Sequence, residues 1–485
     1  MNLIQRIDHW AAAAPEAIAH LSGDRTLTYG ELRRRSDGLA SYLIKRFGDD
    51  RRPIAVLGHR EPEMLIAFLG AVKSGRPYVP IDIALPQTRI DQILASANAA
   101  LTLTPAQIRQ FSTGELGAPT IPVEKNDAFY ILFTSGSTGE PKGVIITLAN
   151  LEHFIGWMLA EQQFSKRAEV FLNQAPFSFD LSVMDLYCSL ATGGTLFSIS
   201  RDLIENPKKL YRALASSGVT TWVSTPSFAQ MCLVEDKFAN AMLPRVQRFL
   251  FCGETLAPHT AAQLLARFPQ AQVWNMYGPT EATVATTSVQ IDAVILEKYS
   301  PLPVGRVMPG TRVFIVDENG VEVSENERGE IIIAGPNVSP GYAGRSDLTD
   351  RAFFEYHDQR AYRTGDLGRF RDSLLFFEGR IDEQIKLTGY RIELGDVEAN
   401  LRALPTVRDA VVIPVIKSGA AQSLTAFVTL TTRNETSDFQ LAHNLRRQLA
   451  ERLPAYMLPR KFILLNVFPM TANGKVDRAA LAKSL

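Results

Sequence analysis

The sequence predicts an α/β protein with three parts: a large N-terminal domain of mostly parallel sheets covered by helices, an antiparallel β subdomain, and a small, mobile α+β C-terminal domain. Three observations support this fold class. Through about the first 300 residues, short apolar runs alternate with helical stretches, as in parallel sheets with helices on both faces. Hairpin-like strands follow. The length of 485 residues exceeds the roughly 250 to 300 at which one hydrophobic core stops growing, so at least two domains are expected.

The elements of the first part can be predicted in chain order. Apolar residues from Leu3 to Trp10 share one helical face, and Thr28 is suited to cap a second helix. Strand-like runs then alternate with helical stretches at 63–72 and 87–95. The predicted strands are Pro53–Leu57, Leu101–Leu103, Tyr130–Phe133, Val170–Asn173, Thr195–Ile199, Thr220–Ser224, Arg248–Cys252 and Gln272–Met276. Ligands of open α/β sheets bind beyond the strand ends, so the polar turns after these runs are the candidate sites.

The pattern changes after about residue 300 to alternating, hairpin-like strands, which predict an antiparallel subdomain over about 300–379. These strands are Arg312–Asp317, Gly329–Ala334 and Leu374–Glu378. A last α+β unit has strands near 410–415 and 424–430 and a helix with leucines every four residues from Leu441 to Leu453. We therefore expect a large domain at 1–379 and a small one at 380–485, whose roughly 105 residues can hold their own core.

The composition favours an enzyme that acts on small molecules. The 51 basic residues balance 51 acidic ones, which argues against nucleic acid or an anionic membrane as the main partner. The N-terminus lacks a long apolar region and no run of about 18 apolar residues occurs, so no membrane insertion is expected. The three cysteines are an odd number without metal-ligand spacing, which speaks against disulfides or a zinc site and indicates a reducing, cytoplasmic location.

The stretch 134–143 is rich in Gly, Ser and Thr and follows the predicted strand Tyr130–Phe133. Its glycines permit consecutive backbone amides to converge, and hydroxyls such as those of Thr134 and Ser135 add donors, which suits phosphate. It is not a Walker A loop, because Lys142 lies between proline and glycine rather than in a Gly-Lys-Ser/Thr sequence. An ordinary surface turn is the alternative.

Six further motifs follow this loop along the chain. They are Ser178–Leu181, Phe251–Glu254, Asn275–Glu281, Tyr362–Leu367, Gly379–Lys386 and Asn473–Lys475. In this order the set resembles the adenylate-forming superfamily, which joins acyl-CoA ligases, luciferases and the amino-acid-adenylating domains of peptide synthetases. The resemblance covers nearly the whole chain. One such motif alone is weak evidence, but six in order make chance agreement improbable.

Within the superfamily, longer stretches resemble the stand-alone ligases that activate D-alanine for teichoic acid D-alanylation. These stretches are Leu172–Leu186, Ser224–Phe228 with Gln230–Leu233, Tyr277–Ala285 and Leu453–Phe462. The resemblance implies ATP and Mg²⁺ as cofactors and a two-step reaction. D-alanine and ATP would give D-alanyl-adenylate and pyrophosphate, and the D-alanyl group would then pass to the phosphopantetheine thiol of a D-alanyl carrier protein. No carrier segment follows Lys475, so the carrier is expected to act in trans.

The resemblance also implies residues that bind the amino acid. Asp180 would hold its α-ammonium, and Cys252 and Val284 would form opposite walls around its methyl group. Each assignment has a structural alternative: Asp180 is equally suited to a helix N-cap or a turn, and a free cysteine is most often a small buried apolar residue.

For the nucleotide, the resemblance implies that Tyr277 offers a face to adenine and Thr280 a hydroxyl to the α-phosphate. Asp366, backed by Arg380, would accept hydrogen bonds from the ribose. Glu281 would bind Mg²⁺, which takes hard oxygen ligands and substrate phosphates. The other residues expected to bind ATP are Thr134, Ser135, Asn275, Met276, Gly278, Pro279, Phe377, Glu378, Gly379 and Lys475. Simple turn or cap roles are the alternatives for the Gly-Pro turn and for Asp366.

Lys475 is the expected catalytic residue and would contact both ATP and the amino acid. Attack of a carboxylate on the α-phosphate spreads charge over the phosphoryl oxygens, so a fixed cation helps most in the transition state. The alternative is an ordinary exposed lysine. Asp382 is expected to be a hinge, because Lys475 would have to leave the site before a phosphopantetheine arm enters.

Two other functions remain open at this stage. One is activation of another small amino acid, or of a fatty or aryl acid passed to CoA. Asp180 argues against the acids that lack an ammonium, since an unpaired buried carboxylate beside an apolar chain is costly. The other is a binding protein without catalysis, which Lys475, Glu281, Asp366 and the intact phosphate loop disfavour.

Overall fold

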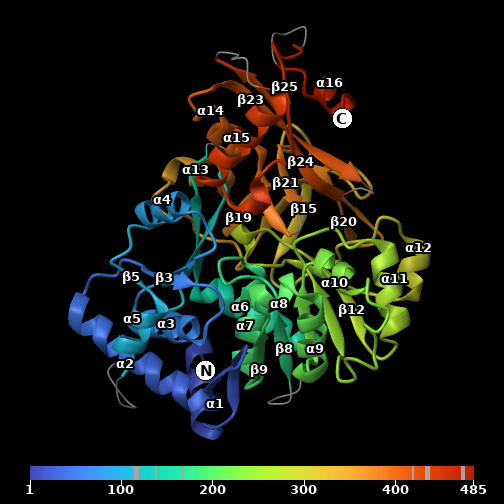
Figure 1. Ribbon diagram of the computed structural model, residues 1–485. Coiled ribbons are helices and arrows are strands. Elements are labelled where there is room, and N and C mark those ends of the chain that lie inside the picture. Colours follow the sequence, from blue (N-terminus) through green and yellow to red (C-terminus); the bar gives the residue numbers. More distant parts are fainter. Residues whose placement is uncertain are drawn as a thin grey trace. The chain divides into compact units, whose positions relative to one another are not determined.

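In the computed structural model the chain forms two compact units (Figure 1). The structure describes residues 1–113, 120–136, 139–164, 169–387, 389–417, 420–431, 437–470 and 476–485. Unit 1 contains Met1–Asp82, Ala97–Leu132 and Gly143–Ile381, and unit 2 contains Asp382–Leu485 with the internal segments Ile83–Ser96 and Phe133–Lys142. The two internal segments fall in the range that the sequence analysis gives to the large domain. The expected division between 379 and 380 stays a prediction.

The larger sheet of unit 1 has nine strands. Its strands β1, β9, β8, β10, β11 and β12 pair in parallel in that order, and β2, β13 and β14 add antiparallel edges. The bounds are β1 Ile18–Ser22, β2 Arg25–Thr28, β8 Val170–Asn173, β9 Thr195–Ser198, β10 Thr221–Ser224, β11 Arg248–Phe251, β12 Gln272–Tyr277, β13 Thr287–Ile291 and β14 Arg306–Val307. All residues of β10 and β11 are buried, as expected for parallel strands covered on both faces.

A second sheet of six strands has the order β17-β7-β6-β4-β3-β5. The strands β3, β4, β5 and β6 pair in parallel, and β17 pairs with β7 antiparallel. The bounds are β3 Ile54–Gly58, β4 Tyr78–Asp82, β5 Leu101–Leu103, β6 Ala128–Thr134, β7 Lys142–Thr147 and β17 Gly341–Tyr342. The Gly-rich stretch thus connects two neighbouring strands, β6 and β7.

The helices of unit 1 follow their sequence signals. α2 (Tyr29–Phe47) starts with the predicted cap, because Thr28 and Glu31 form a capping box. α3 (Pro62–Lys73) and α7 (Leu181–Thr192) are buried at every position, which explains why most of their residues are apolar. The others are α1 Leu3–Ala13, α5 Pro105–Phe111, α6 Leu148–Gln162, α8 Arg201–Glu205, α9 Pro207–Ser217, α10 Pro226–Cys232, α11 Pro258–Arg267, α12 Ala293–Lys298 and α13 Ser346–Ala352.

The third sheet of unit 1 is antiparallel, as predicted for the β subdomain. Its order is β15-β16-β19-β18, and β20 pairs with β19. The bounds are β15 Arg312–Val316, β16 Gly329–Ala334, β18 Phe353–Tyr356, β19 Gln359–Arg371 and β20 Leu374–Arg380. The hairpin of β19 and β20 brings Asp366 opposite Arg380, although the two residues belong to different sequence motifs.

Unit 2 is an α+β structure with its own core, formed by α14, α15 and the sheet β23-β24-β25. Val412 and Ala426 of the sheet and Leu401, Leu445 and Leu449 of the helices belong to this core. The bounds are α4 Gln87–Ala97, β21 Gln384–Leu387, β22 Tyr390–Glu393, α14 Leu394–Arg402, β23 Val407–Lys417, β24 Ala420–Leu430, α15 Asp438–Ala450, β25 Lys461–Leu464 and α16 Arg478–Lys483.

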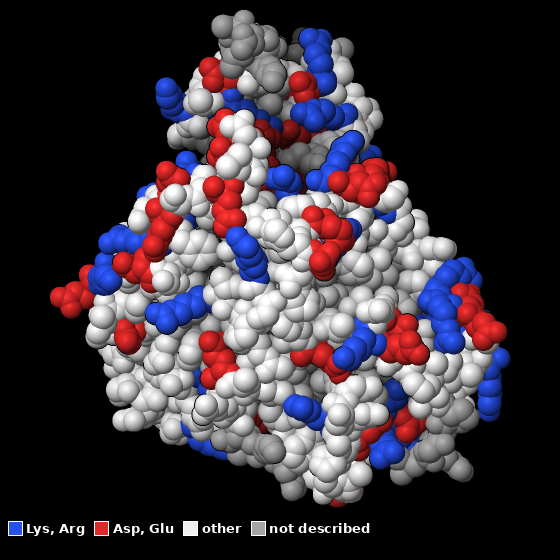
Figure 2. Space-filling model, turned by 180° about the vertical axis from the view of Figure 1, so that it is seen from behind, with Lys and Arg blue, Asp and Glu red and all other residues white. Residues whose placement is uncertain are grey.

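The predicted fold class is confirmed: parallel sheets covered by helices, an antiparallel β subdomain and a smaller α+β part are all present. On the face shown in Figure 2, basic and acidic side chains are interspersed, in keeping with the balance of 51 and 51. Among the described residues, no helix is both long enough and apolar enough to cross a membrane.

Candidate active site

Three predicted nucleotide residues meet where the ends of β12 and β20 lie beside the middle of β19. Tyr277, the last residue of β12, donates its phenol hydrogen to Oδ2 of Asp366 across 2.5 Å. Arg380, the last residue of β20, binds the other carboxylate oxygen and also donates to the carbonyl of Thr364 at 3.1 Å. Asp366 is 3% exposed, and a carboxylate accepts up to about four hydrogen bonds, so it retains capacity for a sugar diol.

Burial, followed by the neighbouring Asp366 carboxylate, raises the pKa of Tyr277 well above its usual value. The phenol therefore remains a hydrogen donor at neutral pH. The centroids of the Tyr277 and Phe377 rings lie 6.1 Å apart and the ring planes are tilted by 37°, so the two aromatic residues predicted to bind ATP are neighbours. Glu378 instead accepts a hydrogen bond from Arg369 at 2.5 Å, and Gly379 has a positive φ of 111° that suits glycine.

Asp180 lies at the N-cap position of α7, but its side chain makes no capping hydrogen bond. Thr280 instead donates its hydroxyl hydrogen to Oδ2 of Asp180 across 2.6 Å. The N-cap alternative is therefore wrong as a description of the Asp180 side chain. The predicted amino-acid residue and the predicted α-phosphate residue are direct neighbours.

Glu281 is fully buried and accepts a hydrogen bond from the Tyr342 hydroxyl at 2.8 Å. The backbone carbonyl of Glu281 also accepts from the amide of Ser339 at 2.9 Å. Sequence analysis missed Tyr342, since it lies in the two-residue strand β17 and carries no motif of its own. No group of three or more His, Cys, Asp or Glu residues suited to a metal ion occurs in the part of the chain that the structure describes.

The turn from Gly278 to Ala285 is unusually tight. A Cβ on Gly278 would lie 2.6 Å from Cα of Ala285, so a larger residue cannot fit there without a backbone shift. Thr283 and Val284 have positive φ angles of 57° and 70°, and the amide of Ala285 donates to the Thr283 carbonyl at 2.9 Å. A bond of this kind around Val284 is a strained γ-turn, and such strain often marks functional sites.

Cys252 follows β11 and is 3% exposed. Its Sγ lies 3.6 Å from the carbonyl oxygen of Val284, so the thiol contacts the backbone of the strained turn directly. The two predicted wall residues are thus adjacent. Whether their side chains face each other across a bound methyl group stays a prediction.

Other predicted nucleotide residues have structural partners. The side-chain amide of Asn275 donates from Nδ2 to the Pro303 carbonyl at 2.8 Å, and Met276 is buried in the main core of unit 1. Pro279 has an extended backbone and precedes a single turn of 3₁₀ helix at Thr280–Ala282, so the turn follows the Gly-Pro pair. These contacts are compatible with either a structural or a binding role.

The two hydroxyl residues of the Gly-rich stretch that were predicted to bind ATP, Thr134 and Ser135, lie in unit 2. Ser135 donates to the carbonyl of Arg391 at 3.1 Å and accepts from the amide of Glu393 at 3.3 Å. Thr134 donates to the carbonyl of Lys142 at 3.5 Å. In the same unit Arg89 donates to the Gly139 carbonyl and forms a buried ion pair with Asp396, both at 3.0 Å. The structure therefore does not group Thr134 and Ser135 in the same unit as the Tyr277, Asp366 and Arg380 cluster.

Lys475 and the rest of 471–475 lie outside the described residues. Asp382 is the first residue of the long segment of unit 2, and its carboxylate accepts from the amide of Gln384 at 3.2 Å.

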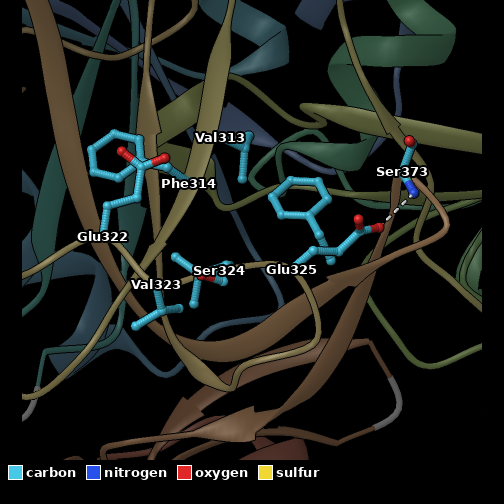
Figure 3. Close-up of a pocket in the computed structure, with 9 residues that line it drawn as sticks. Val313, Phe314, Glu322, Val323, Ser324, Glu325 and Ser373 are labelled. Carbon is cyan, nitrogen blue, oxygen red and sulfur yellow. Dashed lines mark hydrogen bonds between the residues drawn. The ribbon is translucent and has the colours of Figure 1, made fainter.

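A separate pocket of about 400 Å³ lies at the antiparallel sheet of unit 1 (Figure 3). Its lining includes the apolar Val313 and Phe314 and the acidic Glu322 and Glu325, which Figure 3 labels. The dashed line in Figure 3 is the bond from the Ser373 amide to Glu325, 3.1 Å long. None of the nine lining residues is a predicted site residue.

Two protein-family models match the chain. An AMP-binding enzyme model covers residues 7–343, and an AMP-binding enzyme C-terminal domain model covers 396–475. The chain belongs to the AMP-binding enzyme family. Enzymes of the AMP-binding family use ATP, so the predictions of an adenylate-forming enzyme and of ATP are confirmed.

Relatives and solved structures narrow this family further. The chain is 44% identical over 499 residues to the D-alanine–D-alanyl carrier protein ligase of Bacillus cereus (strain B4264), covering 99% of both chains. A Vibrio cholerae adenylation domain, AlmE, in complex with glycyl-adenosine-5'-phosphate, shares the fold at a TM-score of 0.85 and 22% identity, covering 99% of this chain and 97% of that one. An NRPS protein containing adenylation and PCP domains is 26% identical at a TM-score of 0.81, covering 100% and 84%. The predicted resemblance to D-alanine-activating ligases is confirmed.

Proposed function

We propose that this protein is an ATP-dependent, AMP-forming ligase that converts D-alanine and ATP to D-alanyl-adenylate and pyrophosphate. It then transfers the D-alanyl group to the phosphopantetheine thiol of a D-alanyl carrier protein, for D-alanylation of teichoic acid. The observation that carries the proposal is the 44% identity, over 99% of both chains, to a D-alanine–D-alanyl carrier protein ligase. The geometry of Asp180 and Thr280 supports it.

In this proposal Asp180 binds the α-ammonium of D-alanine, because its carboxylate does not cap its own helix and accepts instead from a neighbouring hydroxyl. Thr280, 2.6 Å from that carboxylate, then binds the α-phosphate. Two adjacent side chains would thus hold the amino acid and the phosphate that must react. Bringing the reacting groups together accounts for much of the rate enhancement in two-substrate reactions.

The ribose is proposed to bind Asp366. Its carboxylate is fixed by Tyr277 on one oxygen and by Arg380 on the other, so it cannot rotate to find another partner. A fixed, charged acceptor forms strong hydrogen bonds with a sugar diol. Lys475 is proposed to stabilise the transition state of adenylate formation. Backbone rotation near Asp382 is proposed to switch the enzyme from adenylate formation to thiol transfer.

Mg²⁺ is proposed to bind at Glu281. Magnesium is commonly held by one or two carboxylates together with substrate phosphates, so a single buried carboxylate next to the proposed phosphate residue Thr280 fits. When bound, the ion would offset negative charge on the phosphates. The hydrogen bond from Tyr342 orients the carboxylate for this role.

The carrier protein is proposed to act in trans, and the compartment to be the cytoplasm. Support for a carrier comes from the name of the Bacillus cereus relative and from the solved protein that contains adenylation and PCP domains. The three cysteines are free and buried, which suits a reducing compartment.

The decisive experiment is ATP–pyrophosphate exchange with a panel of amino acids and simple carboxylic acids. We expect exchange with D-alanine above all others, followed by covalent loading of a phosphopantetheinylated D-alanyl carrier protein. If exchange is fastest with glycine, L-alanine or an acid without an amino group, that compound and not D-alanine is the substrate. Absence of exchange with every compound would favour a non-catalytic binding protein.

A further inference from the structure

The C-terminal end of the chain has an uneven charge. Residues 438–485, from the start of α15, contain eight Lys and Arg residues and three acidic residues, Asp438, Glu451 and Asp477, although the whole chain is neutral. A net positive segment in a neutral protein attracts acidic partners over distances of about 10 Å at moderate salt. The described part of this segment begins with helix α15 of unit 2 (Figure 1).

One side of α15 packs into the core of unit 2 through Leu445 and Leu449. The opposite side is exposed and presents Phe439, His443 and Arg446, which share one face because they are four and seven residues apart. Arg447 lies exposed beside them. Phe439 is 81% exposed, among the most exposed of the large apolar side chains that the structure describes.

In the part of the chain that the structure describes, the side chains of this face belong to no core cluster. In the described chain, neither Arg446 nor Arg447 has an ion pair or a side-chain hydrogen bond, whereas many other arginines of this protein are paired. An ordinary solvated face would explain two arginines, but it gives no reason for an aromatic ring in the same row. Aromatic residues and arginine are the residue types enriched at protein interfaces.

We propose that this α15 face, formed by Phe439, His443, Arg446 and Arg447, docks an acidic surface of the carrier protein. The inference rests on the proposed function, which requires the ligase to recognise a folded carrier in addition to its thiol. The arginines would steer and orient the carrier, and Phe439 would supply the apolar contact at the centre. An anionic membrane is a weaker match, because α15 buries its apolar side in unit 2 and leaves a single large apolar residue to insert.

The test compares transfer of D-alanine to two acceptors, the phosphopantetheinylated carrier protein and free pantetheine. Arg446→Glu/Arg447→Glu should lower kcat/KM for the carrier by about tenfold to a hundredfold at low salt, and the effect should shrink as salt screens the charges. Phe439→Ala should lower it by about tenfold with little salt dependence. Transfer to pantetheine and D-alanine-dependent ATP–pyrophosphate exchange should change less than about twofold in both variants, since neither needs the carrier surface.

The matched control is Lys208→Glu/Arg212→Glu, which makes the same charge change on the exposed side of α9 in unit 1. It should leave kcat/KM for the carrier unchanged. An equal loss in this control, or normal carrier kinetics in the α15 variants, would overturn the docking face. If the α15 variants no longer sediment with phosphatidylglycerol vesicles, as the parent does, but keep normal kinetics with the carrier, the face binds a membrane and the proposed carrier docking is wrong. If exchange with D-alanine fails in the unmodified protein, the proposed function is wrong instead.

Discussion

Thr280 donates its one hydroxyl hydrogen to the carboxylate of Asp180 across 2.6 Å. A hydroxyl has a single hydrogen to donate, so Thr280 cannot bond Asp180 and a phosphate oxygen as donor at the same time. The ammonium of a bound amino acid has three hydrogens and a full charge, so it forms the stronger bond to Asp180, and our prediction is that it displaces Thr280 from the shared oxygen. Binding of the amino acid would then release the hydroxyl for the α-phosphate.

We therefore predict that D-alanine tightens the binding of a non-hydrolysable ATP analogue by about fivefold, the value of one hydrogen bond of about 1 kcal/mol. Isothermal titration calorimetry with and without D-alanine measures this coupling. Thr280→Val should abolish it, and Thr280→Ser, which keeps the hydroxyl, should retain it. Undiminished coupling in the valine variant would show that the hydroxyl does not link the two ligands.

The sequence predicts much of this arrangement for a physical reason. Parallel strands buried on both faces are nearly continuous apolar runs whose bounds can be read directly, as in β8, which matches the prediction residue for residue. The antiparallel strand β16, predicted from a hairpin-like pattern, also matches residue for residue. Some motif residues lie at strand ends, and parallel strands bring their ends to one edge, as for Tyr277 at the end of β12. Asp366 lies inside the antiparallel strand β19, so its bond to Tyr277 depends on how two sheets pack and has no such local rule.

Other features carry no local signal. The hairpin of β1 and β2 was not predicted, because its strands are short and only partly buried. The bond between Tyr342 and Glu281 joins residues 61 positions apart, and such contacts depend on tertiary packing. The same holds for the Arg89 and Asp396 pair, which groups the Gly-rich stretch with unit 2 and which no motif marks.

A second prediction concerns acid stability. His20 is fully buried and its Nε2 lies 2.8 Å from Oγ of Ser198. Burial, aided by the charge of Arg25 and opposed by that of Glu63, lowers the pKa of His20 from 6.5 to about 3. Below pH 6.5 the unfolded chain therefore binds a proton that the folded chain does not. Stability should fall as pH falls from 6.5 toward 3, by up to about 1.4 kcal/mol per pH unit.

Urea unfolding at pH 7 and pH 5 measures this loss. The difference between the two pH values should be about 2 kcal/mol smaller in His20→Gln, which cannot be protonated. His9, an exposed histidine on α1, provides the control, because His9→Gln should leave the difference unchanged. If the free energy of unfolding falls equally between pH 7 and pH 5 in both variants and the parent, protonation of His20 does not cause the loss of stability in acid.

A third prediction tests the proposed catalytic lysine. Lys475→Ala should lower the rate of adenylate formation by at least about a hundredfold, the usual effect of removing one electrostatic contact to a transition state. ATP binding and thiol transfer from preformed adenylate should change far less. Single-turnover measurements of each half-reaction separate these effects. Lys483→Ala, at an exposed lysine of α16, should behave like the parent, and equal losses in both half-reactions would point to a structural role for Lys475.

A fourth prediction tests the hinge. Unit 2 resumes at Asp382, directly after Ile381 of unit 1, so backbone rotation at this junction is the simplest way to reorient the units. Asp382→Pro fixes one backbone angle and should abolish one half-reaction while keeping the other. Asp382→Asn, whose side-chain oxygen can still accept from the amide of Gln384, should keep both. Normal rates for both half-reactions in the proline variant would remove the hinge from the mechanism.

The last prediction concerns the choice between D- and L-alanine. If Asp180 fixes the ammonium and the carboxylate points at the α-phosphate, the two isomers differ only in which side of the α-carbon carries the methyl group. The Sγ of Cys252 lies 3.6 Å from the carbonyl of Val284, whose backbone is held at a positive φ of 70°, so sulfur and turn form a rigid surface. A rigid surface discriminates better than a yielding one, and one methyl group in a pocket is worth about 1–3 kcal/mol.

Cys252→Ala should therefore raise kcat/KM for L-alanine and reduce the D over L preference by about tenfold to two-hundredfold, while kcat/KM for D-alanine changes little. Cys232→Ala removes an equally buried thiol in a different core cluster and should keep the parent's preference. If Cys252→Ala also keeps it, the thiol only fills space and another group selects the isomer.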